Sequence, residues 1–118
     1  MRHLKTYENL KTMDNYKNMT YDDTPKVDDY IICNMKIAEH DSEDTVEFKN
    51  FINNNIGHIV FIQNHRIIAS YENIPKKILT YFNYNNGHST HVYLHEIKYF
   101  SDKIKDLEYI ISSNKYNL

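Results

Sequence analysis

The chain has 118 residues, of which 41% are hydrophobic, 14% aromatic and 25% charged, with a net charge of −2. This is the size and composition of one folded domain, and it excludes a disordered chain. One cysteine excludes an internal disulfide scaffold, and two glycines exclude a glycine-rich phosphate loop.

The N-terminal segment differs in character from the rest of the chain. Residues 1–26 are predicted to form a weakly ordered arm, with a short helix ending near Tyr16, and residues 27–118 a single domain. The arm lacks the apolar run of a secretory peptide, and no stretch reaches membrane-spanning length. We therefore expect a soluble intracellular protein that is neither secreted nor membrane-bound.

The first predicted strand spans residues 29–35, because turn-prone aspartates precede a short run rich in β-forming residues. An acidic loop over residues 39–44 follows. Asp44 and Glu47 have the spacing of a capping box, which predicts a short helix over residues 44–52. Residues 21–50 hold nine acids against three lysines, and no segment forms a basic stripe.

Two apolar runs, residues 57–63 and 66–71, flank the two-residue connector Asn64-His65. This pattern predicts a β-hairpin, because Asn tolerates the left-handed backbone of a tight turn. Both runs are nearly continuous in apolar residues, which indicates that both faces are partly covered.

The C-terminal third is predicted to contain a helix after Pro75, a strand over residues 90–94 that runs on toward Ile97, and a final helix that Ser101 caps and that ends at Ile111. Ile104, Leu107 and Ile111 would supply the buried stripe of the last helix. The expected fold class is α+β, mainly β: a small partly open barrel or curled antiparallel sheet with short helices and a C-terminal helix.

The segments Val27-Asp28-Asp29-Tyr30-Ile31-Ile32-Cys33 and Gly57-His58-Ile59-Val60-Phe61-Ile62, followed by Ala69-Ser70-Tyr71, resemble an SH3-like barrel of the KOW type. In such barrels a Gly-Asp-apolar strand precedes a Gly-x-Ile-Val-x-Ile strand. This sequence departs from the pattern at Asp28, where the barrel usually has glycine.

The leader Leu4-Lys5-Thr6-Tyr7-Glu8-Asn9 and the ending around Glu96-Ile97-Lys98-Tyr99-Phe100-Ser101 resemble small uncharacterised proteins of phages and large DNA viruses. The leader is also faintly similar to capsid-targeting leaders of internal head proteins of phages. Asn, Ile, Lys and Tyr dominate the chain, and their AT-rich codons indicate an AT-rich genome. The resemblance implies a viral source, located in the host cytoplasm or the virion.

Histidines are the candidate metal ligands, because His88, His91 and His95 lie close together in sequence and can converge with Cys33 or Glu96. Their spacing matches no standard motif, so surface histidines are the favoured reading and we expect no metal or cofactor. Cys33 sits in mid-strand, where a small buried side chain is more usual than a nucleophile. The acid pairs Asp28-Asp29 and Glu43-Asp44 are more typical of solvated loops than of acid–base catalysis.

Aromatic residues are the remaining candidates for a binding groove. Tyr30, Tyr71 and Tyr93, with Arg66 at the rim, are the predicted groove residues, and the other aromatic and basic candidates are Tyr81, Phe82, Tyr84, Tyr99, Lys76, Lys77 and Lys98. The alternative is that tyrosine is simply the core filler of this chain. The leading hypothesis is a non-enzymatic module that binds a protein partner through a hairpin edge or an aromatic groove. A nucleic-acid-associated barrel and a small metal-binding protein are the alternatives.

Overall fold

The structure is a computed structural model that describes residues 11–12 and 24–116. The predicted N-terminal helix near Tyr16, and most of the predicted arm, lie outside the described residues. Within the described residues, no helix is both long enough and apolar enough to cross a membrane.

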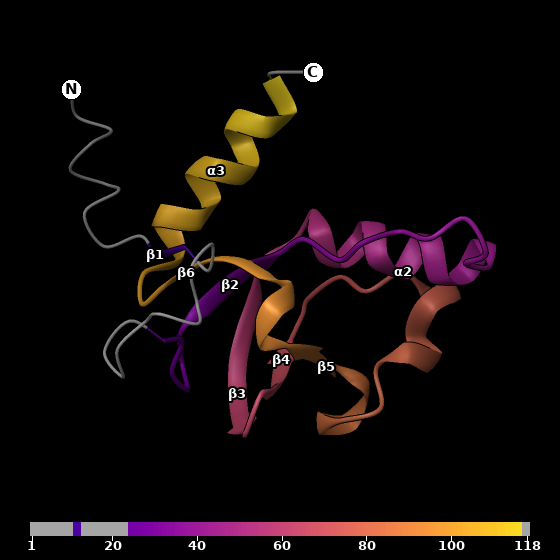
Figure 1. Ribbon diagram of the computed structural model, residues 1–118, viewed down its shortest axis with the longest axis horizontal. Coiled ribbons are helices and arrows are strands. Elements are labelled where there is room, and N and C mark those ends of the chain that lie inside the picture. The colour runs from indigo at the N-terminus through magenta and orange to yellow at the C-terminus, as the bar shows by residue number, and fades with distance from the viewer. Residues whose placement is uncertain (1–10, 13–23, 117–118) are drawn as a thin grey trace.

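A six-stranded antiparallel sheet forms the centre of the fold, in the order β1-β6-β2-β3-β4-β5 (Figure 1). The strands are β1 (Lys11–Thr12), β2 (Tyr30–Cys33), β3 (Gly57–Gln63), β4 (Arg66–Ser70), β5 (Ser89–Tyr93) and β6 (Ile97–Ser101). The helices are α2 (Glu43–Asn53), α3 (Ile104–Tyr116) and the 3₁₀ helices η4 (Lys76–Tyr81), η5 (Asn85–Gly87) and η6 (Leu94–Glu96). The predicted α+β class, with an antiparallel sheet and a C-terminal helix, is confirmed.

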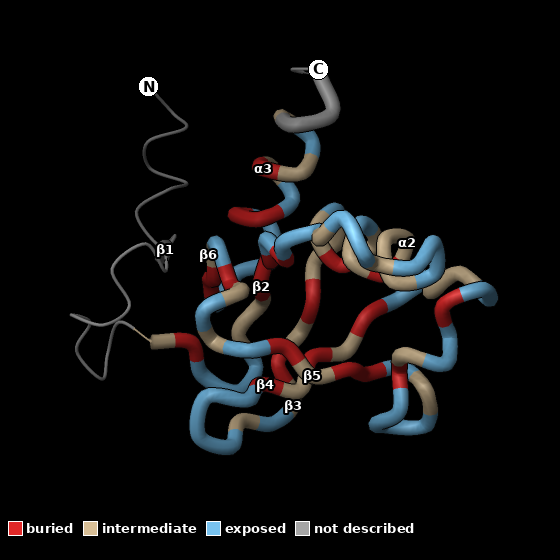
Figure 2. The backbone as a smooth tube through the Cα atoms, turned by 45° about the vertical axis from the view of Figure 1, so that its right-hand side comes forward, coloured by how far each residue is buried: buried red, intermediate tan, exposed pale blue. Residues whose placement is uncertain are grey.

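Strand β2 is covered on both faces, which explains its unbroken apolar sequence. Ile31 belongs to the main core, where the strands pack against α2 and η4. The next residue, Ile32, points to the other face and packs against Leu107 and Ile110 of α3. Figure 2 shows the buried segments running through the strands, while the outer turns of the chain are exposed.

The predicted hairpin is confirmed as β3 and β4, which pair through Gln63 and Arg66 around the turn Asn64-His65. Of these two turn residues, only Asn64 has a positive φ, 59°. The turn therefore places asparagine in the left-handed region and spares His65, whose Cβ would be strained there. The pairing register shifts between Ile59 and Phe61, so β3 bends at a bulge.

The start of β3 is fixed by a close approach to the core. A Cβ added to Gly57 would lie 2.6 Å from both Cζ and Oη of Tyr71, whose side chain is 2% exposed. Only glycine leaves room for this tyrosine ring, which stands at the centre of the aromatic core with Phe51 and Phe82. The contact between Gly57 and the buried Tyr71 ring sets how closely β3 and the segment after β4 approach each other.

The helix starts differ from those predicted. Helix α2 is capped by Ser42, whose Oγ accepts a hydrogen bond from Thr45 N at 3.2 Å, rather than by Asp44. The helix after Pro75 is the 3₁₀ helix η4. Helix α3 begins at Ile104, because Ser101 still belongs to β6, where its Oγ accepts from Lys103 N and donates to Asp106.

Two further differences concern the C-terminal third. The predicted strand over residues 90–94 ends at Tyr93, where η6 turns the chain into the separate strand β6. The predicted stripe of α3 is confirmed at Leu107, but Ile104 is 38% exposed and Ile110 is buried in its place. Ile104 stands in the first turn of α3, where it lines a cavity instead of covering β2.

Candidate functional site

A groove with a volume of about 370 Å³ lies along β5 and is named here the edge groove. Strand β5 and η6 form one side, and α2, η4 and the loop after η4 form the other. Its lining residues are Met35, Phe48, Lys49, Thr80, Tyr81, Asn83, Tyr84, Thr90, His91, Tyr93 and Glu96.

Strand β5 is an edge strand, and the chain itself satisfies part of its outer row. Ser89 pairs with Tyr84 through both backbone groups, and Tyr93 N donates to Glu96 Oε1 at 2.9 Å. Hydrogen bonds from Tyr71 N to His88 O and from Leu94 N to His65 O fix which residues of β5 face β4. Because the bonding alternates along an antiparallel pair, Thr90 and Val92 bond to β4, and the N–H and C=O of His91 point away from it. Within the described residues, no hydrogen bond to the His91 backbone is formed on that open side.

The far wall of the edge groove is held in place by stacking and hydrogen bonds. The rings of Phe48 and Tyr81 are stacked, with centroids 4.6 Å apart, and the Tyr81 hydroxyl lies 2.8 Å from Thr45 Oγ1. Lys49 Nζ donates to Asp41 Oδ2 at 2.8 Å and to the carbonyl of Lys36 at 2.9 Å. This hydrogen bond from Lys49 lowers the pKa of the Asp41 carboxyl below its usual value.

A row of aromatic rings follows the outer side of β5. Tyr84 and His91 meet edge to face, as do His91 and Tyr93, and the rings of Tyr93 and His95 are stacked with centroids 5.8 Å apart. Tyr84 is 40% exposed and Tyr93 41% exposed, so each ring offers much of its surface to solvent. Large exposed rings beside an open strand edge are a typical feature of binding surfaces.

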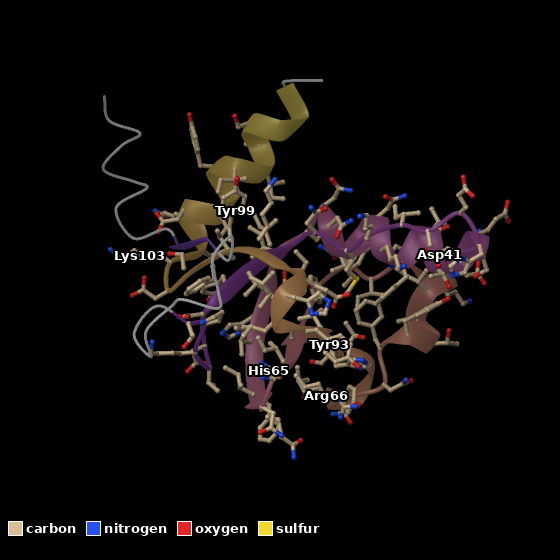
Figure 3. All side chains as sticks on the ribbon, in the orientation of Figure 1. Asp41, His65, Arg66, Tyr93, Tyr99 and Lys103 are labelled. Carbon is tan, nitrogen blue, oxygen red and sulfur yellow. The ribbon has the colours of Figure 1, made fainter. Side chains whose placement is uncertain are left out.

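The structure separates the four predicted groove residues. Tyr93 and Arg66 are direct partners across β5 and β4, and Figure 3 shows them side by side next to His65. Tyr71 is buried in the core, as the core-filler alternative describes. Tyr30 lies elsewhere, in a second cavity between the sheet and α3, where its ring stacks on His58.

The predicted basic rim is also divided. Lys77 is engaged by Glu47 at 3.3 Å and Asp44 at 3.8 Å, and Lys98 lies over the ring of Tyr99. Arg66 is the basic candidate that the sheet register pairs directly with Tyr93.

The histidines do not converge as a metal-binding group. Because β5 ends at Tyr93, His95 lies in η6, and the two histidines of the row sit on either side of the Tyr93 ring. Within the described part of the chain, no group of three or more His, Cys, Asp or Glu side chains is placed to hold a metal ion.

The candidate catalytic residues lie in three different settings. Cys33 is buried in the main core, and burial raises the pKa of its thiol to about 12, so the thiolate is not formed near neutral pH. Burial also raises the pKa of Asp29, whose Oδ2 accepts a hydrogen bond from Lys26 N. Glu43 and Asp44 are exposed in the first turn of α2, where their charges favour the helix N-terminus.

Phe48, Lys49 and Met35 carry no local sequence signal of a site, and the sequence names Tyr81, Tyr84 and His91 as candidates without bringing them together. Their convergence depends on α2 and η4 packing beside β5, which no local pattern encodes. Comparisons of the chain with protein-family models, with curated proteins and with solved structures gave no significant match.

Proposed function

We propose that the chain is a non-enzymatic protein-interaction module with an SH3-like barrel fold, of viral or phage origin, acting in the host cytoplasm or the virion. Its edge groove binds an extended segment of a partner protein, which adds to the sheet as a strand next to β5. The viral origin rests on the sequence resemblance of the leader and the C-terminal segment.

Three features of the fold support the SH3-like assignment. The strands other than β1 follow the order β6-β2-β3-β4-β5. The last of these five in sequence, β6, pairs with the first, β2, as in an SH3-like barrel. The short 3₁₀ helix η6 stands between the last two strands, and β3 bends at its bulge. Asp28, at the motif position where glycine is usual, has a φ of 79°, so the backbone keeps the conformation that glycine favours.

The observation that carries the functional proposal is the open backbone of His91 beside an aromatic-lined groove. An added strand gains main-chain hydrogen bonds from such an edge, and pockets for its side chains give specificity. Tyr81, Tyr84 and Tyr93 supply large rings that lose little conformational freedom on binding. The chain covers this edge at its two ends, through the Tyr84–Ser89 bridge and the Glu96 carboxylate on Tyr93 N, and leaves His91 between them for an added strand.

The test starts from peptides selected on the purified chain from a random phage-displayed library. The informative variant is His91→Pro, which removes the edge N–H while leaving the β4–β5 hydrogen bonds in place. The matched control is His91→Thr, which loses the same side chain but keeps the N–H.

We expect His91→Pro to weaken the selected peptide about tenfold or more relative to His91→Thr, since a lost hydrogen bond that leaves a polar group unpaired costs about 1–3 kcal/mol. Both variants must unfold at temperatures close to each other. Equal affinity of the two folded variants would contradict strand addition at this edge.

A nucleic-acid partner is the second candidate, favoured by one specific arrangement. Phe61, Ile68 and His91 are direct neighbours across three strands, and Phe61 is 53% exposed. Exposed rings on a sheet face can stack on unpaired bases. Fluorescence anisotropy with oligo-dT tests this: saturable binding that weakens steeply with salt and is lost in Phe61→Ala would favour this candidate over the peptide.

A further inference from the structure

A second cavity lies apart from the edge groove, between α3 and the sheet, and has a volume of about 550 Å³. It is named here the helix cleft. Four separate parts of the chain line it: the paired strands β2 and β3, the loop after α2, the segment at the end of β4, and α3. The lining residues are Tyr30, Asn54, Asn55, Ile56, His58, Ser70, Glu72, Asn73, Ile104, Glu108, Ile111 and Ser112.

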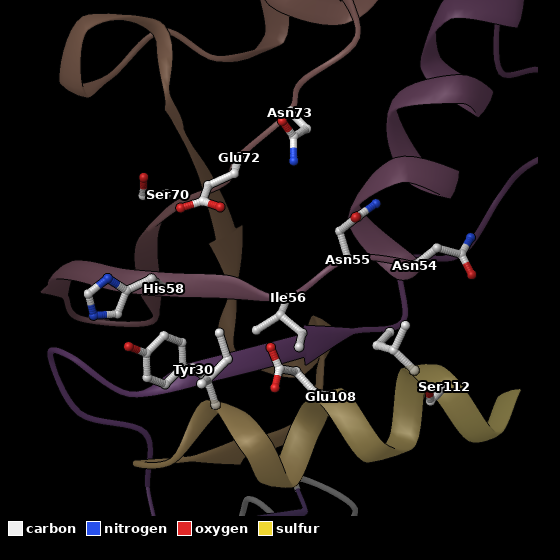
Figure 4. Close-up of a pocket in the computed structure, with 12 residues that line it drawn as sticks. Tyr30, Asn54, Asn55, Ile56, His58, Ser70, Glu72, Asn73, Glu108 and Ser112 are labelled. Carbon is white, nitrogen blue, oxygen red and sulfur yellow. The ribbon is translucent and has the colours of Figure 1, made fainter. Parts of the chain in front are cut away.

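Two carboxylates face the cleft from opposite walls. Figure 4 shows Glu72 above β3, on the segment after β4, and Glu108 below β3, on α3, and both side chains line the cleft. Among the described residues, neither carboxylate has a salt-bridge partner within 4.0 Å. Both negative charges are therefore available to a ligand, and their presence disfavours an anion.

One end of the cleft is a flat aromatic wall. The rings of Tyr30 and His58 stack with centroids 4.7 Å apart and an interplanar angle of 16°. The asparagines add polar groups: Asn55 Nδ2 donates to Phe51 O at 2.8 Å, which leaves its carbonyl oxygen as an acceptor. Asn73 holds a left-handed backbone, with a φ of 57°, at the rim above the space.

The floor of the cleft is apolar, since Ile56, Ile104 and Ile111 line it. Ile104 is 38% exposed, whereas Leu107 and Ile110 of the same helix are buried. A ligand that combines a cationic head with an aliphatic stem would cover this isoleucine and meet the carboxylates at the same time.

We propose that the helix cleft binds a guanidinium group carried on an aliphatic stem, the chemistry of an arginine side chain. A guanidinium ion is planar, stacks on aromatic faces and donates charge-assisted hydrogen bonds to carboxylates, which matches the wall and the charges of the cleft. This site is separate from the edge groove, so the test of the guanidinium proposal does not depend on the outcome of the peptide test.

The test uses the full chain and N-acetyl-arginine amide as the probe, followed by two-dimensional ¹⁵N NMR. The matched neutral probe is N-acetyl-citrulline amide, which keeps the shape of arginine but carries no charge. Glu72→Gln and Glu108→Gln remove one cleft carboxylate each. Glu39→Gln, an exposed position away from the cleft, makes the same change in net charge and serves as the control.

We expect saturable shifts around the cleft with the arginine probe and at least tenfold weaker binding of the citrulline probe. Each glutamine variant in the cleft should weaken the arginine probe about three- to fivefold, the range expected for one partly exposed ion pair. Glu39→Gln should leave it unchanged. Equal binding of the two probes, equal loss in Glu39→Gln, or no saturable binding at all would overturn the proposal.

The guanidinium can come from a small molecule or from a partner protein, and a second comparison separates these sources. N-butylguanidine carries the head and stem without a peptide backbone and has the same single charge as a blocked Gly-Arg-Gly peptide, which adds backbone on both sides. Saturable binding of either probe in the cleft supports the site. Tighter binding of the peptide would assign the site to a protein side chain, and tighter binding of N-butylguanidine would assign it to a small molecule.

Discussion

Substituting Gly57 by alanine tests the contact that positions β3 on the core. The added Cβ would lie 2.6 Å from two atoms of the Tyr71 ring end, far inside van der Waals contact. The ring cannot move away easily, because it is fully enclosed by the core. Overpacking of this kind costs about 1–3 kcal/mol, and the rigid neighbour places Gly57→Ala near the upper end, about 3 kcal/mol.

Urea unfolding of the single and double variants measures this cost. In a Tyr71→Leu background the clashing atoms are gone, and alanine in a strand is favoured over glycine by about 0.5–1 kcal/mol. Gly57→Ala should therefore be neutral or stabilising there, which gives a coupling energy of about 3 kcal/mol or more. A cost below about 1 kcal/mol for Gly57→Ala alone, or the same cost in both backgrounds, would refute the packing argument.

Three further predictions follow from individual groups. Cys33 should resist thiol reagents at pH 8 until the chain unfolds, and rapid labelling of the folded chain would contradict this. Its pKa is about 12 in the folded chain and ordinarily 9.0, so its contribution to stability should fall as the pH rises from 9 toward 12. The Asp41 carboxyl, with its pKa lowered by Lys49, should stabilise the fold above its ordinary pKa of 3.8 and lose that effect as the pH falls through the lower folded value. The stability gap between the native chain and Asp41→Asn should therefore close in acid, and a gap that stays constant from pH 7 to pH 2 would be inconsistent with the ion pair. Asn64→Ala should cost about 1 kcal/mol in thermal unfolding because of its positive φ, whereas Asn64→Gly should cost less; the reverse order would show that the turn is not left-handed there.

Local sequence patterns predicted the elements whose signals are contained within a few residues. The hairpin follows from two β-forming runs and a two-residue connector, and α2 follows from the capping-box spacing of Asp44 and Glu47. The capping box predicts Asp44 as the cap, whereas the helix is capped by Ser42, whose Oγ accepts from Thr45 N.

The strand β6 shows where local reasoning ends. The local pattern predicts a strand over residues 90–94 that runs on toward Ile97, but η6 ends β5 at Tyr93, and the separate strand β6 pairs with β2. That break depends on a long-range pairing, which a local pattern does not contain. Prediction of the candidate site has the same limit. The local sequence does not distinguish Tyr71, which is buried in the core, from Tyr93, which is 41% exposed.

Amide hydrogen exchange at neighbouring residues of β5 tests the central claim most directly. The His91 amide of the unbound chain should exchange rapidly while that of Val92 exchanges slowly, and saturating selected peptide should slow His91 to a rate near that of Val92. If His91 is already as protected as Val92 without peptide, or remains rapid in the complex, the partner does not add as a strand to this edge.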